Sequence, residues 1–103
     1  MKTQTLKCGK HRNNRRVWLD NKQLLNDSGF KVGARYDSTY FPLQVKITLK
    51  KDAEGLRKVA QKKGTHPIID LCSSKVGYAL GECDRVKVSY EDGFITITPE
   101  VTD

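Results

Sequence analysis

The chain has 103 residues, of which 37% are hydrophobic and 30% charged, and its formal net charge is +7 with a pI near 9.5. This length suits one domain with one core, and no apolar run is long enough to span a bilayer. The first residues lack the apolar segment of a secretory signal, so we expect a cytoplasmic protein without a membrane partner. Three cysteines without paired spacing favour reduced thiols over a disulfide framework.

The charge is distributed unevenly along the chain. Residues 1–66 hold sixteen Lys or Arg against five Asp or Glu, whereas residues 67–103 hold three against seven. A clustered positive field is typical of proteins that bind a polyanion, because neutralising phosphates releases condensed counterions. The alternative is a basic soluble protein whose charged side chains are simply solvated.

The first half of the chain is predicted to form a strand, a short helix and two further strands. Their expected ranges are Val17–Leu19, 21–28, 36–40 and 44–49. Asp20 or Asn21 can cap the helix and Gly29 ends it, and the last strand alternates apolar and polar residues.

Residues 50–66 differ in character, because six of these seventeen residues are Lys or Arg and apolar residues are sparse. A helix from Asp52 to Lys63 and a basic loop are both compatible with this composition. Gly55 counts against the helix by about 1 kcal/mol relative to alanine.

The second half is predicted to repeat the order of the first. The expected strands are Pro67–Asp70, 85–90 and 94–98, with a helix slot at 71–79 that contains poor helix formers. Asp92-Gly93, between two alternating runs, predicts a hairpin turn.

Shifting the chain by fifty residues aligns the two halves without a gap. The identical pairs are Asp20 on Asp70, Arg35 on Arg85, Tyr40 on Tyr90, Ile47 on Ile97 and Thr48 on Thr98. One such unit cannot cover the apolar face of its own sheet, so two copies should pack together. We therefore predict one domain over residues 1–103, with repeat one at 15–49, a basic connector at 50–66 and repeat two at 67–99. The expected fold is mainly β with short helices, a barrel with an internal pseudo-twofold axis.

Two stretches carry a resemblance to known families. VWLDNKQLLNDSGFKVGARY, followed by an alternating strand, resembles the repeat of the AbrB/SpoVT swapped-hairpin family, closest to its SymE-like branch, and DGFITITP is similar to the closing hairpin of that family. The opening KCGKHRNNRRVWL resembles small N-terminal regions of phage-type DNA cytosine methyltransferases. The chain departs from the swapped-hairpin pattern at Phe41-Pro42-Leu43, where Asp-Gly is expected, and at Cys83, where a turn glycine is expected.

The resemblance implies a swapped-hairpin barrel that binds DNA through basic residues beside the first strand of each unit. Members of the family commonly dimerise, whereas two units in one chain imply a monomer, with a dimer left open. A role as an accessory or regulatory factor of a phage or mobile element fits this resemblance.

The candidate nucleic-acid-binding residues form two basic tracts, one before each repeat. They are Lys7, Lys10, Arg12, Asn13, Asn14, Arg15, Arg16, Lys50, Lys51, Arg57, Lys58, Lys62 and Lys63. We expect the pseudo-twofold axis to place both tracts on related edges, where they form one broad positive surface. Duplex DNA is the expected ligand, with RNA left open, because arginines can fork onto phosphate and asparagines can read base edges.

Aromatic residues are expected to serve packing. Trp18 is predicted to lie in the core, and the four tyrosines, Tyr36, Tyr40, Tyr78 and Tyr90, are predicted to pack in the barrel or its hairpins.

Other chemistries are less favoured. Cys8, His11, His66 and Cys72 could supply four zinc ligands, but their spacing is irregular, so we expect no metal and no cofactor. No nucleophile has a recognisable base and no phosphate-binding glycine loop occurs, so we expect no enzyme. The alternatives are a protein-binding module that inhibits a host enzyme, with residues 82–100 as its contact surface, and a SymE-like toxin that acts on nucleic acid.

Overall fold

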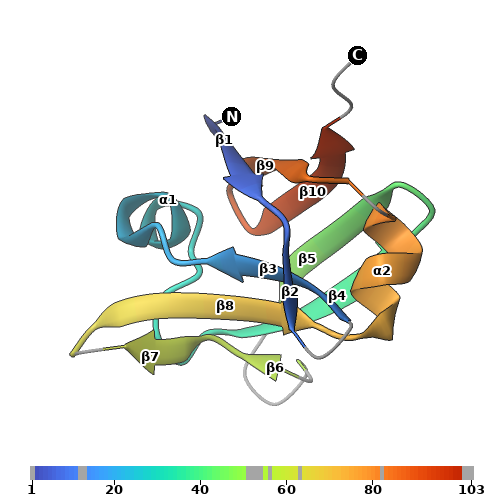
Figure 1. Ribbon diagram of the computed structural model, residues 1–103. Coiled ribbons are helices and arrows are strands. Elements are labelled where there is room, and N and C mark those ends of the chain that lie inside the picture. The colour runs from blue at the N-terminus through green and yellow to red at the C-terminus, as the bar shows by residue number, and fades with distance from the viewer. Residues whose placement is uncertain are drawn as a thin grey trace.

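The computed structural model describes residues 2–11, 14–50, 55, 57–62, 64–81 and 83–100, with the backbone alone at Lys10, His11 and Lys62 (Figure 1). The strands are β1 Lys2–Lys7, β2 Gly9–His11, β3 Asn14–Leu19, β4 Arg35–Phe41, β5 Gln44–Lys50, β6 Arg57–Lys58, β7 Ala60–Lys62, β8 His66–Cys72, β9 Arg85–Glu91 and β10 Phe94–Glu100. The helices are α1 Lys22–Asp27 and α2 Ser74–Leu80. The mainly β fold with short helices is thereby confirmed.

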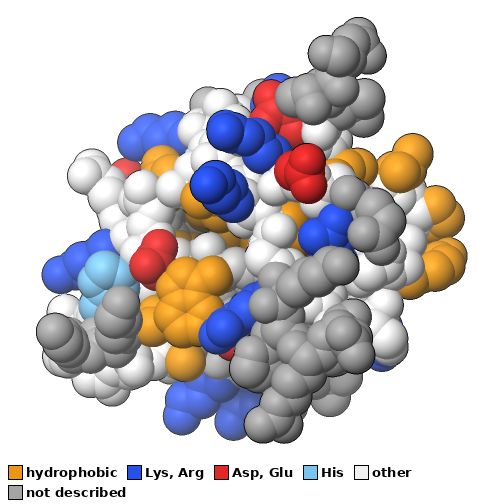
Figure 2. Space-filling view, in the orientation of Figure 1, with side chains coloured by type: hydrophobic (Ala, Val, Ile, Leu, Met, Phe, Trp, Pro, Cys, Tyr) orange, Lys and Arg blue, Asp and Glu red, His pale blue; other side chains and the backbone are white. Residues whose placement is uncertain are grey.

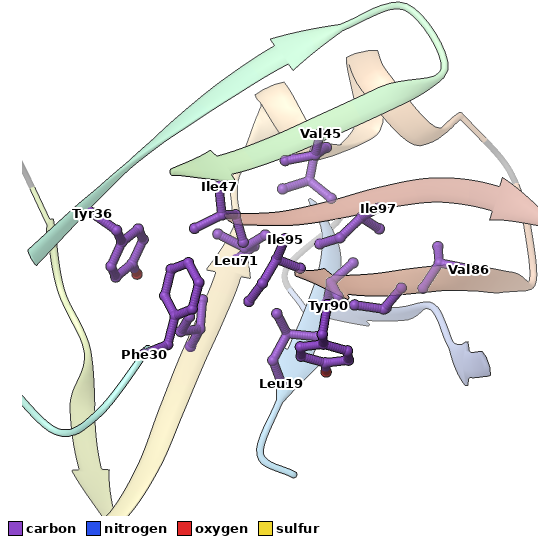
Figure 3. Packing of buried hydrophobic residues seen from close by; sticks show 14 of the residues in the cluster. Leu19, Phe30, Tyr36, Val45, Ile47, Leu71, Val86, Tyr90, Ile95 and Ile97 are labelled. Carbon is purple, nitrogen blue, oxygen red and sulfur yellow. The ribbon is translucent and has the colours of Figure 1, made fainter. Parts of the chain in front are cut away.

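The strands form two antiparallel sheets that enclose the core. One sheet has six strands in the order β1-β9-β10-β5-β4-β6, and the other has four in the order β2-β3-β8-β7. Figure 3 shows side chains of both sheets meeting in one cluster, with Ile47 and Ile95 from the first and Leu19 and Leu71 from the second, all fully buried. The expected barrel is wrong, because the described strands build two separate sheets and no closed barrel.

Replacing each strand by its counterpart about fifty residues away reverses the strand order of each sheet and otherwise leaves it unchanged. In the four-stranded sheet Leu19 pairs with Ile69, and in the six-stranded sheet Lys46 pairs with Thr96, so each residue meets its own counterpart. The hairpins also share a register, since β4 pairs with β5 over 35–41 just as β9 pairs with β10 over 85–91. A twofold relation between the halves therefore passes through both sheets, and α1 and α2 lie at opposite sides of the molecule (Figure 1).

The first helix begins and ends where its residues predict. Asn21 is the N-cap of α1, and its Oδ1 accepts from the backbone N of Leu24 at 3.0 Å. Gly29, with φ 93°, ends the turn, and the Phe30 amide donates to Leu25 O at 2.8 Å while its ring is fully buried. The cap and the glycine satisfy backbone groups that a short helix otherwise leaves exposed.

The second helix forms despite its poor helix formers. Val76, Ala79 and Leu80 of α2 are buried against the core. Tertiary packing therefore outweighs the low helix propensity of this segment, as is usual for short helices in proteins.

The described part of the basic connector contains no helix and consists mostly of short strands, with a turn at Gly64 and Thr65. Residues 57–58 and 60–62 form β6 and β7, which pair with β4 and β8. Val59 lies between them, is 1% exposed, and exchanges backbone hydrogen bonds with Gly33 and Ala34. One buried valine between polar strand residues gives too weak a pattern to indicate a strand pair in advance.

Three further expectations about single residues are wrong. Trp18 lies on the outer face of the four-stranded sheet at 36% exposure, and Tyr78 on α2 is 66% exposed. Asp70 does not end its strand, because β8 continues to Cys72. Tyr36 and Tyr90 are buried as expected and Tyr40 is half-buried. None of the described helices is long and apolar enough to cross a membrane.

Candidate nucleic-acid interface

Basic side chains gather at one end of the outer face of the six-stranded sheet. Arg35 of β4 pairs with Lys50 of β5 on one side and with Lys58 of β6 on the other. Residues directly opposite each other in antiparallel strands share a face, with Cβ atoms about 5 Å apart. These three residues are called the cationic row below, and both lysines are exposed.

The cationic row is electrostatically unfavourable in the free protein, because like charges directly opposite each other destabilise a sheet. Arg35 Nη1 donates to the carbonyl oxygen of Gly55 at 3.3 Å, which orients the guanidinium. Gly55 allows this close approach, since a Cβ there would lie 2.8 Å from Arg35 Cβ. A line of phosphates is the kind of ligand that would neutralise such a row.

Hydroxyl groups and a further lysine continue the same outer face. Thr39, Lys46, Thr96 and Ser89 lie side by side across β4, β5, β10 and β9. Lys46 Nζ stands 5.0 Å from the centre of the Phe94 ring, which holds this cation over the sheet. Hydroxyl side chains and lysines supply a large share of contacts to nucleic-acid phosphates.

The opposite end of the same face carries a mixed charge. Arg85 pairs with Lys7 of β1 and with Glu100 of β10. Glu100 occupies the position that Lys50 has in the first half, so a carboxylate interrupts the positive charge there. Lys7 is therefore separated from the cationic row by the width of the sheet, because β1 and β6 are its two edges.

Two arginines of the first tract are engaged by the protein itself. Arg16 binds Asp70 through two hydrogen bonds of 2.9 Å and lies 4.7 Å from the centre of the Trp18 ring. Arg15 Nε donates to Gly81 O at 3.0 Å. Figure 2 looks onto this outer face of the four-stranded sheet, where apolar, basic and acidic side chains lie next to one another.

The other candidates fall in different places. Asn14 is half-buried at the start of β3. Arg57 is exposed on β6, and its side chain points to the opposite side of the sheet from that of Lys58. Lys10 and Lys62 are described by their backbone alone, in β2 and β7 at the two edges of the four-stranded sheet. Arg12, Asn13, Lys51 and Lys63 lie outside the described residues.

Sequence reasoning did not include Arg35 and Lys46 among the candidate interface residues. The signal for Arg35 was present, because it aligns with Arg85 in the repeat, but that identity was taken as a mark of the repeat alone. Their importance comes from cross-strand neighbours that are distant in sequence, and a search for basic tracts cannot detect such neighbours.

An apolar patch of three exposed side chains lies away from the cationic row. Phe41 ends β4 and is 45% exposed, Leu43 lies in the β4–β5 turn and is 68% exposed, and Tyr78 is on α2. The Leu43 amide donates to Ala79 O at 2.8 Å, which brings the turn against the helix. Figure 2 shows apolar side chains projecting at the side of the molecule where Figure 1 places α2 and this turn.

Two of the groups considered for metal binding, His66 and Cys8, have other partners, and the side chain of His11 lies outside the described residues. No set of three or more His, Cys, Asp or Glu that could hold a metal occurs among the described residues. His66 Nε2 donates to the Asp20 carbonyl at 2.7 Å. Burial raises the pKa of the Cys8 thiol, and the neighbouring Cys83 raises it further, so Cys8 favours the neutral thiol form.

Comparison of the chain with known protein families, with curated proteins and with solved structures finds no match.

Proposed function

We propose that this protein binds duplex DNA through the outer face of its six-stranded sheet, with the cationic row as the main phosphate contact. The observation that supports this function is the alignment of Lys50, Arg35 and Lys58 on three neighbouring strands. Such a row costs stability in the free protein and gains it when phosphates lie along it. The net charge of +7 favours the same class of ligand.

We further propose that the chain is a tandem, single-chain member of the AbrB-type swapped-hairpin superfamily. The support is the pairing of residues with their own counterparts in both sheets, at Leu19 with Ile69 and at Lys46 with Thr96. The resemblance of the opening segment to N-terminal regions of phage-type methyltransferases makes an accessory or regulatory role on phage or mobile-element DNA the preferred setting.

The DNA contact is tested by titrating a labelled duplex at several salt concentrations. The variant Lys50→Gln/Lys58→Gln should bind more weakly than the parent, and the slope of log affinity against log salt should be shallower by about 1.8, which corresponds to two lost phosphate contacts. Arg35 is kept because its side chain also binds Gly55.

The matched control is Lys22→Gln/Lys31→Gln, which removes the same charge from exposed positions elsewhere. This control should keep the salt slope of the parent. Equal weakening in both variants would show that net charge alone matters, and a parent that fails to bind at low salt would exclude the proposal.

A protein-binding module is the second candidate, and the apolar patch favours it. Leu43 adopts φ 65°, a left-handed conformation that costs a non-glycine residue about 1 kcal/mol or more, yet its side chain is exposed. Strain that is not compensated by burial is typical of positions kept for contact with a partner. If the duplex does not bind at low salt, inhibition or modulation of another protein becomes the preferred function.

A further inference from the structure

A pocket of about 280 Å³ opens between β4 and the start of α2. It is lined by Asp37, Ser38, Tyr40, Arg57, Ser73, Ser74 and Lys75. The lining thus combines two cations, four hydroxyl groups and one carboxylate in a space near the lower limit of small-molecule sites. Its residues come from segments far apart in sequence, which only the folded chain brings together.

The corresponding positions in the other half of the molecule are buried and more apolar. Ser38 and Tyr40 correspond to Val88 and Tyr90, both buried, and the Tyr90 hydroxyl donates to Gln4 Oε1 of β1 at 2.8 Å. In that half Leu6 of β1 pairs with Val86 of β9, whereas beside the pocket Arg57 of β6 pairs with Tyr36 of β4. The same arrangement of strands therefore carries buried side chains in one half and a polar pocket in the other, so the fold itself does not require the pocket.

Several polar groups of the pocket have capacity for a ligand. Ser73 is the N-cap residue of α2 but its side chain makes no capping hydrogen bond, in contrast to Asn21 of α1. The Tyr40 hydroxyl accepts from Ser38 at 3.4 Å and keeps its own hydrogen for a further acceptor. Arg57 is held by the Tyr36 hydroxyl, and this contact opposes the rise that burial causes in the pKa of that tyrosine.

We propose that this pocket binds the phosphomonoester of a nucleotide. Arg57 and Lys75 supply charge to the phosphate and the serine hydroxyls donate to its oxygens, as charge-assisted hydrogen bonds to phosphate require. The pocket is larger than a phosphate group alone needs, and the Asp37 carboxylate can accept a hydrogen bond from a sugar hydroxyl or a base amino group. The site goes beyond the proposed duplex contact, since its cations and hydroxyl groups are other residues than those of the cationic row.

The test is calorimetric titration of the full chain with adenosine 5′-monophosphate, with adenosine as the control ligand. The monophosphate should bind at least about tenfold more tightly than adenosine, because only it engages both cations. Single-stranded oligonucleotides with a 5′-phosphate or a 5′-hydroxyl distinguish the source of the phosphate. A 5′-phosphorylated strand that binds more tightly than the free nucleotide assigns the pocket to strand ends, and the reverse order assigns it to free nucleotides.

Two variants locate the binding in the pocket. Lys75→Gln removes one cation, and Ser38→Val introduces the residue that the other half carries at the equivalent position, so the fold should tolerate it. Each should weaken the monophosphate about tenfold or more, whereas Lys22→Gln, an exposed lysine in the first turn of α1, should not.

The proposal is overturned if the monophosphate does not bind the parent, or if Lys75→Gln and Lys22→Gln weaken it equally. Its failure is separable from that of the duplex contact, because Lys50→Gln/Lys58→Gln leaves the lining of the pocket intact. Thermal melting of each variant confirms that a lost affinity is not a lost fold.

Discussion

The β4–β5 turn shows at the scale of single residues how the two halves differ. Leu43 has φ 65° where its counterpart Gly93 has φ 87°. Glycine adopts this conformation without steric cost, whereas leucine does not. The turn with Asp92-Gly93 is thus the relaxed form, and the turn with Pro42-Leu43 is the strained and apolar one.

Replacing Leu43 with glycine should stabilise the protein. The relief of left-handed strain, less the added chain entropy of glycine, amounts to up to about 1 kcal/mol, or a rise in Tm of about 4–8 °C. Thermal and urea unfolding measure the change. The control is Gly93→Ala, where a new Cβ meets no atom within 4 Å, so that only the backbone cost of about 1 kcal/mol should appear. If Leu43→Gly destabilises as much as this control, the leucine side chain packs more than its 68% exposure indicates.

At the scale of elements, β1 is the largest departure from the expected fold. The first basic tract was treated as an approach to the strand at Val17, yet Lys2–Lys7 pairs along its whole length with β9. Only Gln4 and Leu6 turn toward the interior, so alternation is barely visible in KTQTLK. Non-local pairing makes this strand, and its contact with Tyr90 links the N-terminal segment to the second half.

The burial of Tyr90 should make stability fall at high pH. Burial raises the pKa of Tyr90 well above its usual value, so this group contributes stability that is complete below about pH 10 and is lost as the pH rises further. Tyr36 and Cys8 act in the same direction, because burial raises their pKa values too.

Tyr90→Phe should therefore lose about 1 kcal/mol at pH 7 and show a smaller further decrease between pH 9 and 11 than the parent. Urea unfolding at each pH measures this difference. Tyr78→Phe, at a side chain that is 66% exposed, should reproduce the parent at every pH. An unchanged alkaline decrease in Tyr90→Phe would show that the other buried groups account for it.

At the scale of the whole molecule, the twofold relation lies within one chain. The pairs β3–β8 and β5–β10, which would join two subunits if the halves were separate chains, are intramolecular. Each half thereby covers the apolar face of the other within one chain.

Sedimentation velocity should accordingly find a monomer of 11.7 kDa at micromolar concentration. Should a dimer form through the apolar patch, Leu43→Gly/Tyr78→Ser would return it to the monomer. A dimer that persists in this variant would contradict the expectation that one chain completes the fold.

Most elements could be predicted because their causes are local or periodic. Asn21 and Gly29 define the ends of α1, Asp92-Gly93 marks the last hairpin, and alternation marks β5 and β10. The basic connector could not be assigned, since β6 and β7 depend on partners in β4 and β8. The clusters of basic residues are visible in the sequence, but the sequence does not show which of these side chains are available to a ligand.

That availability depends on neighbours that the chain meets only after folding. The segment from Lys7 to Arg16 is dense in positive charge, yet Asp70, 54 positions away, binds Arg16. Lys50, Arg35 and Lys58 become one row because three strands align them in register. Side-chain periodicity and turn chemistry act over a few residues and can be recognised in the sequence, whereas electrostatic partners are set by strand register and become visible in the folded molecule.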